Sequence, residues 1–260
     1  AALTIKSGNA IVLRGSSYAQ RSNAALAGIV REALAEAGLP EDSVLLLDAS
    51  DRDGLAELAT QEGVVDLLIP RGGEGLKEAI KAVATVPVMY AAAGNCHVYV
   101  HSEADLEMAK RIVVNAKVQR PGVCNAAEKL LLDAAIVERF APEVFAALAA
   151  AGVELLGDER ARAAAGDVEI GDATAEDWDT EYLALKMAVA VVDSVEDAVD
   201  HINAHGTGHS EAVVTESAQA ADTFVAGVDA AAVYVNASTR FTDGFEYGMG
   251  AEIGNSTQKL

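Results

Sequence analysis

Short apolar runs alternate along this chain with longer stretches in which apolar residues recur at helical spacing. Over residues 20–37 the apolar positions fall three and four residues apart, which is typical of an amphipathic helix, and Gly38 follows as a helix-end signal. The short runs are apolar at consecutive positions, so both faces of the strands that they predict should be buried. That pattern favours a parallel sheet covered by helices on both sides.

The same pattern predicts the other elements. Strands are predicted at residues 9–14, 43–48, 64–70, 86–90, 97–100, 129–132, 153–156, 183–192, 211–215 and 231–235. Helices are predicted at residues 20–37, 51–60, 76–84, 105–117, 134–151, 195–204 and 218–225. Residues 161–178 should form a loop and residues 236–260 an irregular tail, because both are rich in Gly and polar residues. A break near residues 92–96 divides two α/β units. The chain begins without Met, inside what reads as a helix, which indicates a fragment.

Composition limits the class of protein. A chain of 260 residues that is 51% hydrophobic can form one large or two moderate domains. Only 5% of its residues are aromatic, so the core should consist of Ala, Val, Leu and Ile. The net charge of −21 argues against binding to nucleic acid or to an anionic membrane surface. The carboxylates are scattered, which fits solubility better than a specific basic partner.

The two cysteines, Cys96 and Cys124, are too few for a disulfide framework in a chain of this length. Cys96 and His97 are neighbours in a predicted strand and should face opposite sides, so Cys96 is expected in the core. The first residues resemble neither a signal peptide nor a transit peptide, and no apolar run reaches the ~18 residues of a membrane span. We therefore expect a cytoplasmic protein.

Cys124 is the residue that most clearly suggests chemistry. It lies in a Pro-Gly turn at residues 118–128 (Val-Gln-Arg-Pro-Gly-Val-Cys-Asn-Ala-Ala-Glu), between a predicted helix and a predicted strand. The nearby cations Lys117 and Arg120 would favour the thiolate over the thiol. A thiolate can attack an acyl carbon and hold it as a thioester. The alternative is a buried, inert cysteine.

His201, His205 and His209 have the spacing of metal ligands on a helix. Gly206 and Gly208, however, break the helix between the second and the third histidine, so the three should not share one face. We therefore predict no metal site.

Six further runs accompany the turn at residues 118–128. They are Lys-Ser-Gly-Asn-Ala (6–10), Ile-Pro-Arg-Gly-Gly (69–73), Gly-Asn-Cys-His-Val-Tyr-Val (94–100), Gly-His-Ser-Glu-Ala (208–212), Val-Tyr-Val-Asn-Ala-Ser-Thr-Arg-Phe-Thr-Asp-Gly (233–244) and Gly-Ala-Glu-Ile-Gly (250–254). Together these runs resemble the gamma-glutamyl phosphate reductase branch of the aldehyde dehydrogenase superfamily, and the turn is similar to the nucleophile segment of that family. They extend over the whole chain, although family members are longer at both ends.

The resemblance implies an aldehyde dehydrogenase-like α/β fold. Residues 1–94 would be part of a Rossmann-type NADP-binding domain, residues 95–236 an α/β catalytic domain, and residues 237–260 a substrate loop and return segment. The family is usually dimeric or larger, so a homodimer is expected for the full-length protein. Association with the glutamate kinase of the same pathway is a further expectation.

The implied reaction is the NADPH-dependent reduction of L-glutamyl 5-phosphate to L-glutamate 5-semialdehyde, with release of phosphate, in proline biosynthesis. Cys124 would expel phosphate and hydride would reduce the thioester. Hydrolytic aldehyde dehydrogenases place a Glu base before the position of Gly94, whereas residues 90–93 here are Tyr-Ala-Ala-Ala, which favours transfer to phosphate. Two alternatives stay open: a CoA-acylating or oxidising aldehyde dehydrogenase, and a truncated, inactive module that only binds ligand.

Substrate contacts are expected around the turn. The resemblance implies that the Cys124 backbone N–H and an Asn upstream of residue 1 stabilise the oxyanion. Asn115, Gln119 and Asn125 are candidates for orienting the substrate, with turn or cap residues as the alternative. Arg120 would meet the departing phosphate or the substrate carboxylate, unless it forms a surface salt bridge.

Ser238, Thr239 and Arg240 resemble the substrate loop of the family. The Arg240 guanidinium could take the α-carboxylate of the glutamyl group by two hydrogen bonds.

Two Gly-containing turns, each between a strand and a helix, are expected to hold NADPH or NADP. The turn after residue 14 suits an adenosine ribose, with a cation for a 2′-phosphate, and the turn at residues 71–75 lets a pyrophosphate approach a helix N-terminus. A glutamate would hold the nicotinamide ribose, as the resemblance implies. The predicted cofactor-binding residues are Arg14, Ser16, Arg71, Gly72, Gly73 and Glu181.

Overall fold

The computed structural model describes residues 1–48, 53–72, 74–91 and 93–258. The chain divides into two compact units, residues 1–90 and residues 91–260, and each is described here by itself. The boundary lies somewhat earlier than the predicted one at residues 94 and 95. Residues 237–260, which the sequence sets apart, belong to the second unit.

The N-terminal unit is built on a two-stranded parallel sheet. Its elements are α1 (Ala2–Lys6), β1 (Ile11–Arg14), η1 (Ser17–Ala19), α2 (Gln20–Glu36), η2 (Glu41–Ser43), β2 (Val44–Leu47), α3 (Asp53–Leu58) and α4 (Glu74–Val83). Ile11 pairs with Val44 and Arg14 with Leu47. Because α2 connects the two strands, β1, α2 and β2 form a βαβ unit whose strands end side by side. The predicted helix at 51–60 begins in residues outside the described ranges.

Two predictions for this unit are wrong. Residues 64–70 and 86–90 are not strands, but are joined by one parallel bridge between Leu68 and Val88. The Leu68 N–H donates to Pro87 O and the Met89 N–H donates to Leu68 O, each over 2.9 Å. Pro87 has no N–H to donate, which limits the ladder at this point.

The C-terminal unit contains a sheet of seven parallel strands in the order β6-β5-β7-β4-β3-β8-β9. The strands are β3 (Cys96–Val100), β4 (Ala127–Asp133), β5 (Glu154–Gly157), β6 (Gly171–Asp172), β7 (Lys186–Val192), β8 (Ser210–Val214) and β9 (Ala232–Val235). The helices are α5 (Leu106–Val118), α6 (Val137–Ala150), α7 (Glu159–Ala163), α8 (Ala175–Asp179), α9 (Val195–His205), α10 (Ala218–Gly227) and the 3-10 helix η3 (Thr239–Phe241).

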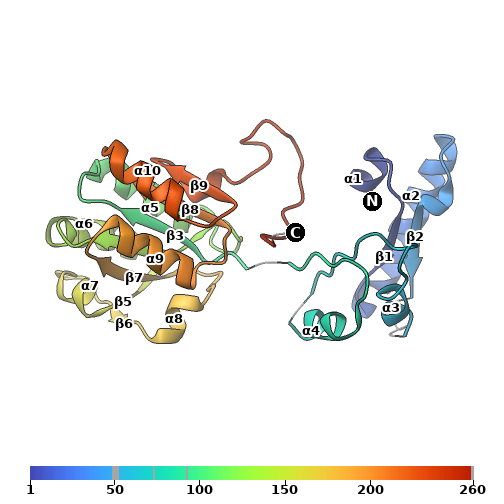
Figure 1. Cartoon of the computed structure of the whole chain (residues 1–260), viewed down its shortest axis with the longest axis horizontal. Helices are drawn as coiled ribbons and strands as arrows, with labels where there is room; N and C mark the ends of the chain where they lie inside the picture. The colour runs from blue at the N-terminus through green and yellow to red at the C-terminus, as the bar shows by residue number, and fades with distance from the viewer. Residues whose placement is uncertain (49–52, 73, 92, 259–260) are drawn as a thin grey trace. The chain divides into compact units, whose positions relative to one another are not determined.

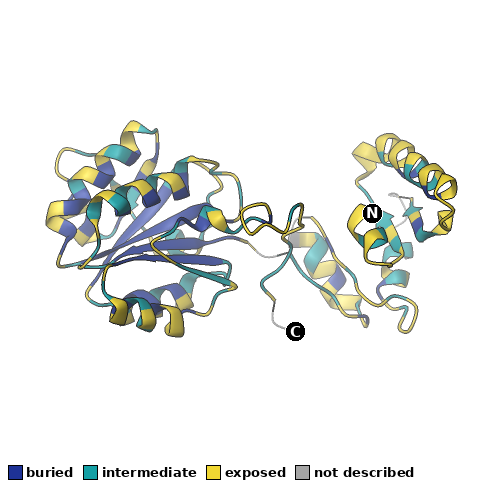
Figure 2. Ribbon diagram, turned by 90° about the horizontal axis from the view of Figure 1, so that it is seen from above, coloured by how far each residue is buried: buried dark blue, intermediate teal, exposed yellow. Residues whose placement is uncertain are grey.

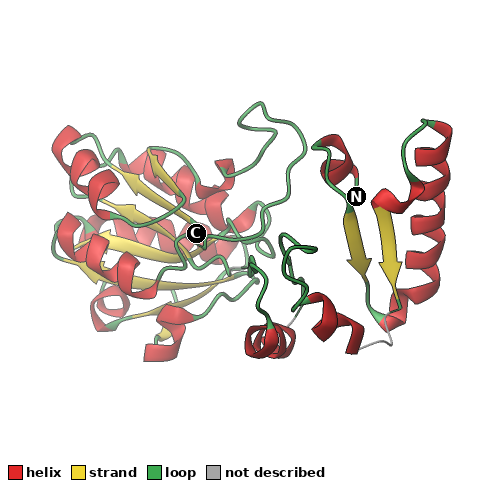
Figure 3. Cartoon of the chain, turned by 45° about the vertical axis from the view of Figure 1, so that its right-hand side comes forward, coloured by secondary structure: helices red, strands yellow, loops and turns green. Residues whose placement is uncertain are grey.

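Helices cover both faces of this sheet, as the apolar runs predict (Figures 1 and 3). Helices α5 and α6 pack on one face, where Leu130 contributes to the core, and α9 and α10 pack on the other, where Leu131 does. Both leucines are fully buried although they are neighbours in β4. The central strands are accordingly buried along their length (Figure 2).

The predicted loop at residues 161–178 contains regular structure. Helix α7 starts before it, β6 adds an edge strand, and α8 lies at its end. The sequence signal for α8 is a capping box, in which Thr174 N–H donates to Asp177 Oδ2 over 2.8 Å. A threonine followed three residues later by an acid marks such a helix start, so the polar composition alone was misleading.

The strand predicted at residues 183–192 begins later, at Lys186. Leu183 has a φ angle of 53°, in the left-handed region, which is incompatible with a strand. Among the described residues, no helix is long and apolar enough to cross a membrane.

Replacing Phe145 with Ala should destabilise the C-terminal unit by about 3–5 kcal/mol, because the side chain is fully buried in the core beneath α6. Urea unfolding followed by the fluorescence of Trp178, the chain's single tryptophan, would measure this. The matched control is Phe245→Ala: Phe245 is 74% exposed, so its loss should change the free energy of unfolding by less than about 0.5 kcal/mol. Equal effects of the two substitutions would contradict the assignment of the core.

Candidate active site

Cys124 lies on the turn between α5 and β4, at the N-terminal end of the parallel strands. Helix α5 starts at a firm cap, since Asp105 Oδ1 accepts the N–H groups of Glu107 and Met108 over 3.0 Å. The turn is closed by a hydrogen bond from Ala126 N–H to Val123 O over 3.0 Å. The thiol is exposed, so the alternative of a buried, inert cysteine does not apply.

The predicted substrate loop is attached to this turn although more than a hundred residues separate the two in sequence. Thr239 Oγ1 donates to Asn125 O over 2.7 Å, and Asn125 Nδ2 donates to Thr242 O over 2.9 Å. Arg240 Nε donates to Gln119 Oε1 over 3.1 Å. The structure thus brings Gln119, Asn125, Thr239 and Arg240 together beside Cys124.

Ser238 and Thr239 are both buried, and Ser238 Oγ accepts from Arg240 N–H over 3.3 Å. Ser238 therefore caps the short helix η3 that carries Arg240. Its position supports a structural part in shaping the loop.

The backbone before β3 lies directly against the Cys124 turn. A Cβ atom added to Gly94 would stand 1.7 Å from Cys124 O, so no other residue fits there without displacing the turn. Gly94 N–H donates to Glu181 Oε1 over 2.7 Å, which brings the predicted ribose-binding carboxylate to the same place. Cys96 is fully buried, as expected, and its Sγ donates to Cys124 O over 3.1 Å.

One predicted cation is not available to the thiol. Lys117 is fully buried and its Nζ is 2.7 Å from Glu128 Oε2, so its charge is satisfied inside the protein rather than at Cys124. Arg120 is exposed on the turn, and Asn115 is an exposed residue of α5 with no described side-chain contact to Cys124.

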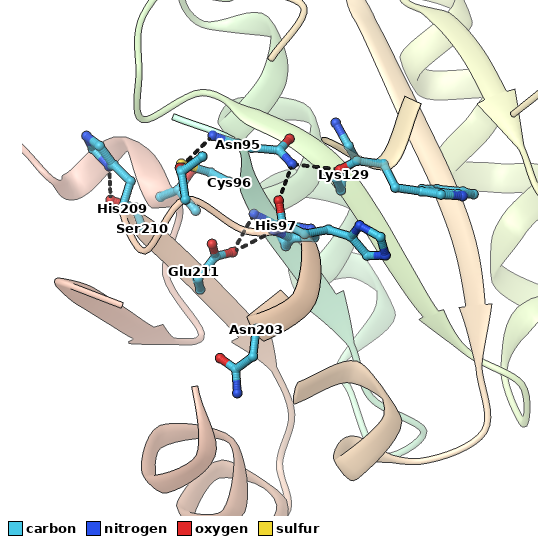
Figure 4. Close-up of polar contacts among 12 residues, drawn as sticks. Asn95, Cys96, His97, Lys129, Asn203, His209, Ser210 and Glu211 are labelled. Carbon is cyan, nitrogen blue, oxygen red and sulfur yellow. Dashed lines mark hydrogen bonds and ion pairs between the residues drawn. The ribbon is translucent and has the colours of Figure 1, made fainter. Parts of the chain in front are cut away.

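A buried polar cluster that the sequence analysis did not predict lies on the α9 side of the sheet (Figure 4). His97 and Glu211 are register partners in β3 and β8. Glu211 Oε2 accepts from His97 N–H over 2.6 Å and lies 3.0 Å from His97 Nδ1. Burial lowers the pKa of His97 well below, and raises the pKa of Glu211 well above, their usual values. The sequence signal that could have revealed this cluster is the presence of a His and a Glu, His97 and Glu211, within otherwise apolar strands.

Asn95 lies between Gly94 and β3 and is anchored by three hydrogen bonds. Its Nδ2 donates to Trp178 O and His205 O over 2.7 and 2.8 Å, and its N–H donates to Thr207 Oγ1 over 3.0 Å (Figure 4). These bonds fix the residue that follows Gly94.

The three spaced histidines do not gather. The rings of His201 and His205 are 4.8 Å apart, and His97 approaches His201 at 5.6 Å. His209 instead bonds Ser210 Oγ through Nδ1 over 2.8 Å. Within the described residues, no group of acidic, His or Cys side chains has the arrangement of a metal site.

The N-terminal unit has a cavity of about 220 Å³ where β1 and β2 end. It is lined by Gly15, Gln20, Asn23, Ala24, Leu46, Leu47 and Asp48. A Cβ atom on Gly15 would lie 1.9 Å from Asn23 Nδ2, so the glycine leaves room for the Asn23 side chain at the cavity wall. Asp48, whose Oδ1 accepts from Gln20 Nε2 over 3.1 Å, was missed. An acid after the second strand of a βαβ unit was the signal.

The other predicted cofactor residues have varied surroundings. Arg14 ends β1 beside the cavity, and Ser16 Oγ accepts from Tyr18 N–H over 3.3 Å, which makes it a helix cap. Arg71 and Gly72 are exposed before α4, and Gly73 lies outside the described residues.

A parallel sheet with an exposed thiol on the turn before a central strand, in a chain that also contains a βαβ unit with a cavity where its strands end, is the arrangement of a thiol-dependent dehydrogenase. The sequence model of the aldehyde dehydrogenase family matches residues 1–165, and the chain therefore belongs to that family. The fold class expected from the sequence is confirmed.

Individual relatives agree with this. A gamma-glutamyl phosphate reductase of Lacticaseibacillus casei is 58% identical over 260 residues, which is 100% of this chain and 62% of the relative. The crystal structure of a gamma-glutamyl phosphate reductase from Thermotoga maritima is 49% identical with a TM-score of 0.94, over 99% of this chain and 62% of that one. The chain thus spans about 62% of the length of such relatives.

A more distant structure shows the shared fold alone. It is a glyceraldehyde-3-phosphate dehydrogenase from Methanocaldococcus jannaschii in complex with NADP, 18% identical, with a TM-score of 0.66 over 91% of this chain and 60% of that one.

Replacing Gly94 with Ala should displace the Cys124 turn, because the added Cβ would overlap a backbone oxygen that cannot rotate away. We expect a loss of about 1–3 kcal/mol in the free energy of unfolding and a changed rate of Cys124 alkylation by iodoacetamide. Gly122→Ala is the matched control in the same turn, since its Cβ would meet Leu183 O at an ordinary 3.7 Å. A Gly94→Ala protein indistinguishable from this control would contradict the close contact.

Stability should fall in mild acid because of His201. Burial, with His97, His205 and Lys129 nearby, lowers the pKa of His201 from 6.5 to about 3. Between these values the unfolded state binds more protons than the folded state, so the free energy of unfolding decreases as the pH falls. From pH 7 to pH 5 this contributes about 1–2 kcal/mol. Urea unfolding by circular dichroism should show a loss smaller by that amount in His201→Phe, and parallel losses would refute the assignment.

Proposed function

We propose that this chain carries the thiol site and part of the cofactor site of an NADPH-dependent gamma-glutamyl phosphate reductase. The observation that carries the proposal is the exposed Cys124 with the loop of Thr239 and Arg240 attached across its turn. The names of relatives that are more than half identical over the whole chain support the substrate, L-glutamyl 5-phosphate.

In this reaction the Cys124 thiolate attacks the acyl carbon, and the bond from that carbon to the phosphate oxygen breaks. Phosphate leaves with the bonding electrons. Because it is a fair leaving group without prior protonation, no strong acid is needed. NADPH, when bound, supplies a hydride to the thioester carbonyl. The resulting thiohemiacetal then expels the Cys124 thiolate and releases the aldehyde, L-glutamate 5-semialdehyde.

The thioester must meet hydride before water. Residues 90–93, Tyr-Ala-Ala-Ala, offer no carboxylate that could activate a water molecule. The absence of a general base in this segment favours the phosphate-dependent reaction over hydrolysis.

Arg240 is placed to select the substrate. Its Nε is held by Gln119, which orients the guanidinium and leaves the two terminal nitrogens for the α-carboxylate of the glutamyl group. Asn125 is buried and is held through its Nδ2, which supports its alternative part as a turn residue. Arg120 and Asn115 are exposed, and we assign phosphate attraction to Arg120.

The cofactor assignment rests on the cavity beside β1 and β2, whose glycine edge and polar lining fit an adenosine ribose. Arg14 would meet the 2′-phosphate of NADPH, and Ser16 shapes the turn. Asp48 would contact the ribose hydroxyls, and its charge opposes that of a 2′-phosphate, so Arg14 is the residue on which a preference for NADPH depends. We assign Arg71, Gly72 and Gly73 to the pyrophosphate, and Glu181 to the nicotinamide ribose.

The test is the reverse reaction, in which the chain reduces NADP with glutamate 5-semialdehyde, with and without phosphate. Parent chain and Cys124→Ala are compared. We expect activity that requires both phosphate and Cys124, with a loss in the variant on the order of a thousand-fold or more.

Activity that does not depend on phosphate would instead indicate an oxidising or CoA-using enzyme of the same fold. A folded parent chain without activity, whose Cys124 still reacts with iodoacetamide, would refute the proposal for this chain and favour a ligand-binding module.

A further inference from the structure

A buried ion pair closes the base of the Cys124 turn. Lys117 lies in the last turn of α5, before Cys124, and Glu128 is the second residue of β4, after it. Lys117 Nζ and Glu128 Oε2 are 2.7 Å apart, and both side chains have 0% exposure. The pair therefore joins the two ends of the loop that carries the nucleophile.

Glu128 also holds a second segment. Its Oε1 accepts from Leu183 N–H over 3.2 Å. Leu183 has a φ angle of 53°, which a leucine adopts only when its surroundings impose it. The next residue of β4 adds a further bond to the same segment, since Lys129 Nζ donates to Thr180 O over 2.8 Å and lies 4.7 Å from the centre of the Tyr182 ring.

The segment held in this way, residues 180–183, carries Glu181. Glu181 Oε1 accepts from Gly94 N–H over 2.7 Å, and Gly94 lies against the carbonyl of Cys124. These contacts form a closed ring. Glu128 and Lys129, which follow the Cys124 turn, bond to residues 180–183. Glu181 in that segment bonds to Gly94, and Gly94 packs against the Cys124 turn.

Stability alone does not explain the ion pair. Burial lowers the pKa of Lys117 and raises the pKa of Glu128, against the opposing effect of the partner charge. Apolar side chains of similar size usually stabilise a protein as well as a buried ion pair does. Apolar side chains cannot form the directional contacts by which the Glu128 carboxylate joins Lys117 to the Leu183 backbone.

We propose that Lys117, Glu128 and Lys129 are positioning residues that hold the Cys124 turn and the Glu181 carboxylate in one fixed arrangement. All three side chains are fully buried, so they act through the residues that they hold. The inference deepens the proposed function, because it names what places the nucleophile and the ribose-binding carboxylate, but its test does not depend on turnover.

The test uses amide hydrogen exchange, measured by NMR on the 260-residue chain. Gly94 N–H reports on Glu181, and Ala126 N–H reports on the Cys124 turn. The first variant, Lys117→Met with Glu128→Leu, replaces the ion pair by apolar side chains. The second variant, Lys129→Met, removes the bond to Thr180 and the contact of the ammonium group with the Tyr182 ring. It keeps the Lys117–Glu128 ion pair and provides the test if the first variant does not fold.

In the first variant, Gly94 and Ala126 should both exchange on the order of ten times faster, although neither contacts a replaced side chain through its N–H. In Lys129→Met, Gly94 should exchange faster by a similar factor. The amides of Val98 and Val213, inside β3 and β8, should stay within about two-fold of the parent in both variants.

The matched control is Lys110→Met, which removes a half-buried lysine of the same helix that pairs with Glu107 and with Glu143 of α6. It should leave the Gly94 and Ala126 amides unchanged. The proposal is overturned if Gly94 exchanges at the parent rate in the variants that fold, or if all amides of the unit accelerate together, as a purely structural role requires. A chain that lacks reductase activity but shows the expected exchange pattern would refute the proposed function and leave the positioning role standing.

Discussion

The contact between Gly94 and the carbonyl of Cys124 is the constraint on which the rest of the site depends. Because there is no room for a Cβ atom, the strand before β3 and the turn before β4 meet backbone to backbone. Backbone atoms cannot rotate away as side chains do, so the position of the thiol follows from the fold itself. Glu181 then uses the Gly94 N–H, and Cys96 uses the Cys124 carbonyl, so each neighbour is placed relative to the same contact.

The buried residues of the sheet change in character along the strands. From Val98 to Val100 in β3 and from Leu130 to Leu132 in β4, the buried residues are aliphatic or aromatic. Buried ionisable residues gather at the beginning of the strands, where His97, Glu128, Lys129 and Glu211 lie, and Lys117 joins them from the end of α5. Buried charges reduce stability unless they are paired and hydrogen-bonded. Their concentration where strands begin, close to Cys124, is therefore better explained by the placement of groups than by folding stability.

Much of the fold could be predicted from the sequence because its signals are local. Consecutive apolar residues such as Leu130 and Leu131 predict a strand buried on both faces, and the structure confirms it. Errors arose where a second, equally local signal was overlooked. Pro87 ends a ladder that the apolar pattern alone would extend, and the capping residues Thr174 and Asp177 start a helix that polar composition alone would deny.

The site was only partly predictable, because its contacts join residues far apart in the chain. Cys124 and Arg240 have recognisable surroundings in sequence, and the structure brings them to the same turn. The pairing of His97 with Glu211, by contrast, depends on the register of β3 and β8, which no sequence spacing reveals. The burial of Lys117 depends on Glu128 in the same way: a lysine near a helix end looks solvated until its partner is known.

Two kinds of hydrogen bond attach the predicted substrate loop, residues 238–242, to the Cys124 turn. Thr239 and Asn125 bond to backbone carbonyls, whose positions do not change when neighbouring side chains are replaced. The Arg240 and Gln119 side chains instead bond to each other, and Gln119 is exposed. Under the proposed function, a different pair of side chains at these two positions would alter which substrate group is recognised, while Thr239 and Asn125 keep the loop in place. The position of Cys124 and the attachment of the loop can then stay constant while the groups offered for recognition vary.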